Sequence, residues 1–359
     1  ARSTGGFLVA NTNDPRTLIE RVSEDVRAYY EVSYTPTLRE YDGKFRSVEV
    51  RILRPDVDVQ SRSGYFAVPP SSDAPVLPFE IPMLVALNSE RPPTDFKYRN
   101  RVLRYGVEAG WTQYVFVTEV PLGTFTYSED EEMQTYQTRF SLLTLLKDDK
   151  GQILKKFTQD YPLQGPLIKA SLVKAGSVIF MREYDLPPGR YTVESAVVDH
   201  LSQRVSTRRA RLVVIDSGEE LAISSLSVIR RVDPVDENFD EDHPFFYEGS
   251  RVIPNLSGTI LSDGDEEVGV YCVVYPSEQS SNDPVMTLEL WKGGKALARG
   301  NPVLSEPDEH GQVKFVGTVP VAGLDSGRYE VKAVVQQGNA VVEAHAFFTM
   351  AAVPAAGTF

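Results

Sequence analysis

The feature that most constrains the fold is an element that occurs twice. Residues 186–193 and residues 324–331 both read L-x-x-G-R-Y-x-V. Glycine permits a sharp turn between strands, and the tyrosine two positions later can start a strand with its ring inward. Its hydroxyl group then lies within reach of the backbone at the turn. The element therefore predicts a strand–turn–strand corner in each half of the chain.

The similarity between the two halves extends beyond this element. An apolar strand at 115–117 is echoed at 270–273, and a hairpin around 147–151 is echoed around 292–295. In each half the order is strand, hairpin, strand, corner, strand. This order predicts two copies of one β unit.

The corner itself resembles the tyrosine corner of immunoglobulin-like and fibronectin-like sandwiches. Four residues would form the two structural tyrosine corners: Gly189, Tyr191, Gly327 and Tyr329. The Cys…Trp…Cys pattern of antibody domains is absent, so the resemblance implies only the broad Ig-like architecture.

A length of 359 residues predicts two or three domains. The Pro- and Ser-rich stretch 69–75 is a linker by composition. We predict one Ig-like sandwich over 76–216 and a second over 217–350. The small, apolar stretch 351–359 is a C-terminal tail.

The segment 1–68 has a different pattern. Asp14 and Pro15 begin an amphipathic helix over 14–31, and alternation of apolar and polar residues predicts a hairpin over 44–67. A short strand, one helix and one hairpin cannot enclose a core. Residues 1–67 should therefore expose apolar surface unless an upstream segment or a protein partner covers them. Self-assembly would be one way to cover it.

The motifs of this segment resemble the tail of the VWFA-related domain family best known from Acidobacteria. In that family a von Willebrand factor A domain ends in a TGG strand, a helix, a YY-x-x-x-Y-x-P strand and an R-x-G-Y hairpin. The matching residues here are Thr4-Gly5-Gly6, Tyr29-Tyr30, Tyr34-Thr35-Pro36 and Arg62-Ser63-Gly64-Tyr65.

This resemblance implies an exported protein with a periplasmic, cell-surface or extracellular location. It also implies that the chain is the downstream part of a longer protein. The D-x-S-x-S loop with which an A domain binds its metal does not occur in the 359 residues. The resemblance therefore places any metal-dependent adhesion site upstream.

The net charge of −13 argues against nucleic acid and anionic membrane surfaces as partners. No run of 18 apolar residues occurs, so we expect no transmembrane segment.

Acidic side chains suggest calcium as the one candidate cofactor, because hard cations need several oxygen ligands on one flexible loop. Asp263, Asp265 and Glu266 form the best candidate, since Gly264 allows a tight turn. The loop lacks the spacing of a dedicated calcium loop, and a solvated acidic turn is the more ordinary interpretation. We expect no other cofactor.

Catalytic motifs are missing. The chain has four histidines but no H-E-x-x-H and no G-x-S-x-G. Asp199 and His200 are neighbours in a strand and would point to opposite faces. A hydrolase would need His200 or His310 beside an acid and a nucleophile in one cleft, so we predict that the chain is not an enzyme.

Two apolar features remain. Phe245, Phe246 and Tyr247 follow an acidic loop and do not fit an alternating strand, so they are candidates for an interface. The single cysteine, Cys272, lies in an apolar run and is expected to be a buried core residue rather than a reactive thiol.

We therefore predict a mainly β chain in which an α/β remnant of a VWFA domain precedes two tandem Ig-like sandwiches. The expected function is that of a non-catalytic structural or protein-interaction component of an exported or envelope-associated assembly. The alternative is a carbohydrate- or peptide-binding adhesion module whose metal-dependent A domain lies upstream.

Overall fold

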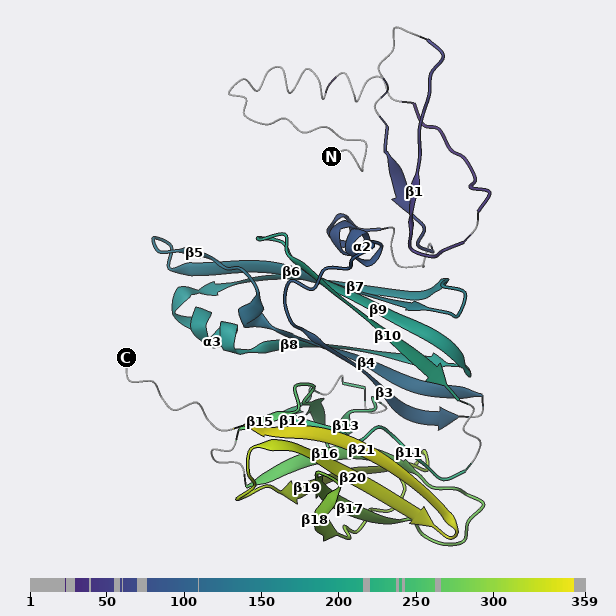
Figure 1. Ribbon diagram of the computed structural model, residues 1–359, viewed down its shortest axis with the longest axis vertical. Helices are drawn as coiled ribbons and strands as arrows, with labels where there is room; N and C mark the ends of the chain where they lie inside the picture. The colour runs from purple at the N-terminus through teal and green to yellow at the C-terminus, as the bar shows by residue number, and fades with distance from the viewer. Residues whose placement is uncertain are drawn as a thin grey trace. The chain divides into compact units, whose positions relative to one another are not determined.

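The computed structural model describes residues 23, 30–38, 40–54, 59, 61–69, 76–108, 110–215, 220–236, 239–240, 243–261 and 266–351. Over these residues the chain is mainly β (Figure 1). It forms two compact units. Unit 1 comprises Ala1–Phe96, Phe125–Leu167 and Tyr191–Arg211, and unit 2 comprises Lys97–Thr124, Ile168–Arg190 and Leu212–Phe359.

Unit 1 is built on an antiparallel sheet centred on β6 (Thr135–Lys147). One edge of β6 pairs with β7 (Ile153–Pro166), and the other pairs with β9 (Gly189–Asp199) and the short β5 (Ser128–Asp130). β10 (Val205–Val214) pairs with β9 at the edge of the sheet.

A short helix covers one face of this sheet (Figure 1). A 3-10 turn, η2 (Pro78–Glu80), leads into α2 (Ile81–Leu87), whose Met83, Leu84 and Leu87 pack on apolar residues of β6, β9 and β10. The sequence analysis predicted an Ig-like sandwich from residue 76 and named no helix there, so α2 is an element that it missed.

A buried ion pair joins η2 to the sheet. The Lys156 ammonium group lies 3.0 and 2.9 Å from the two carboxylate oxygens of Glu80, and both side chains are shielded from solvent. The Leu77 backbone N–H also donates to Glu80, at 3.0 Å. The carboxylate is therefore satisfied only while η2 stays docked on β7.

The predicted hairpin over 44–67 is present but much shorter. β1 (Phe45–Ser47) pairs antiparallel with β2 (Gly64–Phe66). Val50 and Ile52 are exposed and belong to no strand. Alternation stabilises a strand only when one face is buried, and no described element covers these residues. The predicted helix over 14–31 lies outside the described residues, apart from Ser23, Tyr30 and Glu31.

Backbone groups beside β1 attach this segment to the rest of unit 1. The Ile153 N–H donates to the Tyr41 carbonyl at 2.7 Å, and the Lys147 ammonium donates to the Asp42 carbonyl at 3.0 Å. The Asn88 side chain donates to the Gly43 carbonyl at 2.9 Å.

Unit 2 contains a three-stranded antiparallel sheet in the order β3 (Arg99–Glu108), β4 (Trp111–Pro121) and β8 (Ser177–Leu186). Short helical elements flank these strands. η3 (Leu122–Thr124) follows β4, whereas η4 (Leu167–Lys169) and α3 (Ala170–Ala175) precede β8.

The rest of unit 2 is a β-sandwich. In its first sheet, β16 (Glu267–Tyr275) pairs with β19 (Val313–Pro320) on one side and with β11 (Ala222–Ile223) and β12 (Ser227–Pro234) on the other. β12 continues to β14 (Ser250–Pro254) and β13 (Phe246–Tyr247).

The second sheet of the sandwich is largely antiparallel. Its strand order is β15 (Thr259–Leu261), β21 (Ala340–Ala351), β20 (Gly327–Gln337), β17 (Val285–Lys292) and β18 (Lys295–Gly300), with β15 parallel to β21. The inward residues of both sheets form one apolar core, which includes Val270, Cys272, Leu288, Val331 and Phe348.

Strand pairing confirms the internal repeat. The order β10-β9-β6-β7 recurs as β21-β20-β17-β18, and β3-β4-β8 recurs as β12-β16-β19. β9 begins at Gly189 and β20 begins at Gly327, the glycines of the repeated element. The domain limits 76–216 and 217–350 stay a prediction, because the compact units follow sheets rather than consecutive chain segments.

The second corner is held by its tyrosine. Gly327 has φ of +141°, a value that side-chain-bearing residues rarely adopt. The Tyr329 ring is buried in the sandwich core, and its hydroxyl donates to the Asp325 carbonyl at 2.6 Å. In the first copy, the Tyr191 ring is likewise buried.

Helices are short in the part of the chain that the structure describes. The longest, α2, has seven residues, and none of the described helices has the length and apolar character needed to cross a membrane.

The buried Glu80–Lys156 pair yields a stability prediction. Lys156→Met leaves the Glu80 carboxylate buried without a cation, and we expect the free energy of unfolding to fall by about 3–5 kcal/mol. Urea denaturation of the full chain measures this loss. The double variant Glu80→Leu/Lys156→Met removes the charge as well, so it should recover most of the stability. Equal losses in the single and double variants would contradict this explanation.

Candidate functional site

The proposed calcium loop is only partly described. Asp263 and Asp265 lie outside the described residues. The Glu266 carbonyl accepts hydrogen bonds from the N–H groups of Val321 and Ala322, at 2.9 and 3.2 Å. Among the described residues, no group of three or more His, Cys, Asp and Glu side chains could hold a metal ion. Calcium binding at this loop stays a prediction.

The proposed interface residues lie inside unit 2. Phe245 is fully buried, with its ring centroid 5.0 Å from that of Tyr105 in β3 and 5.7 Å from that of Tyr271 in β16. The Tyr271 hydroxyl donates to the Pro244 carbonyl. Phe246 and Tyr247 form β13 and are half-buried. The Phe245 ring therefore joins the three-stranded sheet to the β16 sheet.

Cys272 is also fully buried, in the sandwich core. Burial raises the pKa of its thiol to about 12. The thiolate, which is the reactive form, is therefore negligible near neutral pH. This environment fits the structural role predicted from the sequence.

A serine, a histidine and an aspartate meet on the α2 face of the unit 1 sheet. Ser141 Oγ lies 2.7 Å from Asp160 Oδ1 and 2.6 Å from His200 Nε2. The Arg139 guanidinium group binds Asp160, with its closest nitrogen at 2.8 Å. The residues come from β6, β7 and the turn after β9. Sequence analysis named His200 but missed Ser141, Asp160 and Arg139.

The order of these groups does not suit acyl transfer. A catalytic serine gives its proton to a histidine that an acid orients from behind. Here Ser141 lies between the acid and the histidine. The Asp160 carboxylate can only accept, so it takes the hydroxyl proton, and His200 Nε2 must then donate to Ser141. His200 in this arrangement is a donor to the serine rather than its base.

The electrostatics of the cluster lead to the same conclusion. Burial tends to raise the pKa of Asp160, but hydrogen bonds from Arg139 and Ser141 outweigh it and hold that pKa below its usual 3.8. Burial and the Arg139 cation lower the pKa of His200 from its usual 6.5, against the pull of Asp160 and Asp199. Ser141 is itself fully buried. The cluster is a polar network that ties the middle of β6 and β7 to the turn after β9.

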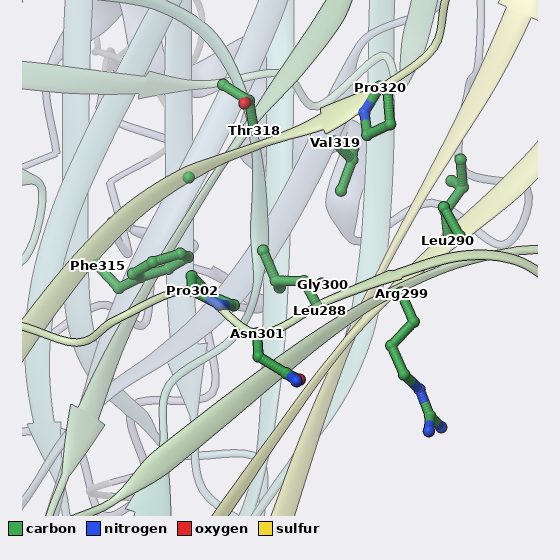
Figure 2. A pocket seen from close by; sticks show the side chains of 12 residues that line it. Leu288, Leu290, Arg299, Gly300, Asn301, Pro302, Phe315, Thr318, Val319 and Pro320 are labelled. Atoms are coloured by element: carbon green, nitrogen blue, oxygen red, sulfur yellow. The ribbon is translucent and has the colours of Figure 1, made fainter.

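A cavity of about 280 Å³ opens between β18 and β19, the facing edge strands of the sandwich. Its apolar wall includes Leu288 and Leu290 from β17 and Phe315 and Val319 from β19 (Figure 2). The Arg299 side chain extends away from the Phe315 ring in this view and pairs with Glu289. The apolar side of the cavity is therefore continuous with the sandwich core.

Small residues create this cavity. In the β17–β18 register, Ala298 stands opposite Leu290 and Gly300 stands opposite Leu288, so both face the core. Across the gap, Gly317 of β19 has no side chain, and a Cβ there would collide with the Phe315 ring. A Cβ on Gly300 would meet nothing within 4 Å. The space beside Gly300 is open.

A second candidate surface lies on unit 1, where exposed apolar side chains gather in the segment 30–53. Tyr30 is 93% exposed and Val32 is 78% exposed, in the alternating run Tyr30–Tyr34. We refer to the following residues as the exposed apolar set: Tyr30, Val32, Tyr34, Leu38, Val50, Ile52 and Leu53. Contiguous exposed apolar patches mark interaction sites, and the closeness of these residues in sequence makes the set a candidate for such a patch.

No protein-family model and no curated protein matches this chain. The C-terminal domain of the Streptococcus pyogenes antigen I/II-family protein AspA is 9% identical, covers 72% of this chain and 99% of that chain, and has a TM-score of 0.22. The C-terminal domain of the Streptococcus agalactiae AgI/II polypeptide BspA is 11% identical, covers 71% of this chain and 100% of that chain, and has a TM-score of 0.19.

A calcium binding mutant of Bacteroides uniformis beta-glucuronidase 2 is 10% identical over 35% of this chain, with a TM-score of 0.22. That match spans 13% of the beta-glucuronidase chain. Similarities at this level do not identify a family for the chain.

The His200 environment yields a pH prediction. Because folding lowers the pKa of His200, the unfolded chain binds the proton more readily. The stability that His200 contributes is therefore present above about pH 6.5 and is lost as the pH falls through the folded pKa. We expect His200→Asn to flatten the fall in melting temperature between about pH 7 and pH 5, a range above the titration of most carboxyl groups.

His310→Asn is the matched control, because the His310 side chain is largely exposed. Thermal unfolding followed by circular dichroism measures both variants against the unmodified chain. An unchanged pH dependence in His200→Asn would show that this histidine does not carry the effect.

Proposed function

We propose that the chain is a non-catalytic structural or protein-interaction component of an exported or envelope-associated assembly. The observation that carries this proposal is the exposed apolar set on unit 1. Burial of apolar surface contributes about 25 cal/mol per Å² to the free energy of binding, so a partner that buries the exposed apolar set would be stabilised in the complex. The repeated β unit supports the proposal, since duplicated sandwiches are common scaffolds for interaction surfaces.

The proposal includes the origin of the N-terminal segment. Residues 1–68 are the tail of a VWFA domain of the VWFA-related family, followed by two tandem Ig-like sandwiches. The supporting residues are the TGG, YY-x-x-x-Y-x-P and R-x-G-Y motifs. In this proposal, the exposed apolar set packs against either the upstream part of that domain or a separate protein. A periplasmic, cell-surface or extracellular location follows from the same family resemblance.

A second candidate function is a carbohydrate- or peptide-binding adhesion module with its metal-dependent domain upstream. The cavity between β18 and β19 favours the peptide form of this alternative, because it lies between two strand edges.

Photo-cross-linking in the native source tests the main proposal. We place p-benzoylphenylalanine at position 53, within the exposed apolar set, and expect a cross-link to one discrete polypeptide or to an upstream segment of the same chain. The control position is 201, where Leu201 is exposed on unit 1 but far along the chain from the set. Adding Val32→Ser and Ile52→Ser should lower the yield at position 53, because these changes remove apolar surface.

Peptide mapping of the adduct identifies what covers the set. A cross-link to a second copy would establish self-assembly, which sedimentation velocity would show independently. A monodisperse monomer with no more cross-linking at position 53 than at position 201 would overturn the proposal.

A further inference from the structure

We define the seam of the sandwich as β18, β19 and the cavity between them. Each of these two strands has one edge with which no described strand pairs. β18 ends the sheet β15-β21-β20-β17-β18, and β19 pairs only with β16 among the described strands. Edge strands carry a row of N–H and C=O groups that a further strand can bind. The seam thus offers backbone hydrogen bonds directly beside an apolar cavity.

The connection between the two strands leaves this edge available. Residues 301–308 run from β18 towards β19 without forming a strand. Pro302 lines the cavity and Leu304 packs on the sandwich core, whereas Val303 is 94% exposed. No described backbone hydrogen bond joins 301–308 to β18 or β19. The connection therefore passes beside the cavity without filling it.

We propose that the seam binds an extended peptide of a partner protein, which adds as a strand along the outer edge of β18. One bulky apolar side chain of the peptide enters the cavity beside Gly300. A branched aliphatic or phenyl side chain fits the wall of Leu288, Leu290 and Phe315, which offers apolar contact and no buried charge.

The charges of the edge select the flanks of the peptide. Lys295 begins β18 and stands opposite Lys292, and β18 itself carries no acidic residue. Arg299, near the other end, is already paired with Glu289, so the basic part of the edge is the Lys295 end. An acidic residue of the peptide beside Lys295 would complement it, because unlike charges across an interface favour one register. The predicted ligand is an extended peptide with a central apolar anchor and an acidic flank.

Strand addition distinguishes a peptide from a free small molecule. A small apolar compound would use the cavity alone, whereas a peptide also pairs with the β18 backbone. The hydrogen-exchange rates of the β18 amides separate the two modes. The seam proposal does not depend on what packs against the exposed apolar set. Cross-linking at position 53 and peptide binding at the seam can therefore fail separately.

The test uses the full chain and a fluorescent nine-residue probe with alternating Thr and Val, a central Phe and Asp at both ends. We expect saturable binding by fluorescence anisotropy and slower hydrogen exchange in residues 295–300. Probes with Ser in place of Phe, or with N-methyl groups on alternate amides, should bind at least about tenfold more weakly, which corresponds to about 1.4 kcal/mol.

Gly300→Leu fills the cavity, since a side chain there meets open space, and should weaken binding of the Phe probe at least about tenfold. Val303→Leu is the matched control, because it adds bulk on the exposed side of the neighbouring segment, and should leave binding unchanged. If Gly300→Leu does not fold, Ala298→Leu fills the same cavity from the next inward position.

Three results would overturn the proposal. The first is no binding of the Phe probe to the folded chain. The second is equal binding by the Phe and Ser probes, or by the unmodified chain and Gly300→Leu. The third is binding of the Phe probe without protection of residues 295–300, which would show that the peptide does not add as a strand along β18.

Discussion

Unit 2 depends on one strand that is covered on both faces. Alternate residues of β16, including Val270 and Cys272, enter the sandwich core, while Tyr271 and Val273 pack with Phe245 and residues of the three-stranded sheet. A strand buried on one side tolerates polar residues on the other, but β16 tolerates them on neither. This explains its nearly continuous apolar run. It also explains why Cys272, the chain's one cysteine, is buried. On the other face of β16, Tyr271 packs against the Phe245 ring, and this contact holds the His243–Tyr247 segment.

Period-two patterns and the repeated corner predicted much of this fold. The two corners fall at the starts of β9 and β20, and the hairpins around 147–151 and 292–295 join β6 to β7 and β17 to β18. Such features are local, so one stretch of sequence contains their whole cause. The helix α2 was missed because its apolar run is short and carries Pro82 near its start. Its stability comes from packing on the sheet and from the Glu80–Lys156 pair, whose partners are far apart in the chain.

The candidate sites were harder to predict for the same reason. Ser141, Asp160 and His200 come together only because β7 and β9 flank β6 in one register. A motif search finds residues that are close in sequence, and these are not. The cavity had a weak local signal, since glycine inside a strand often marks close approach of another group. Gly317 fits that rule through the Phe315 ring, but the open space beside Gly300 depends on which strand faces it.

The two copies of the β unit differ most in the length of one pair of equivalent strands. β7 has 14 residues and pairs along the whole of β6, whereas its counterpart β18 has six. A central strand pairs with a strand on each side. After a duplication, a change in its length or register must therefore remain compatible with both neighbouring strands. An edge strand has one such neighbour and can shorten with little effect on the rest. A duplicated chain can therefore keep one copy intact as scaffold while the other gains a recognition surface at its margin.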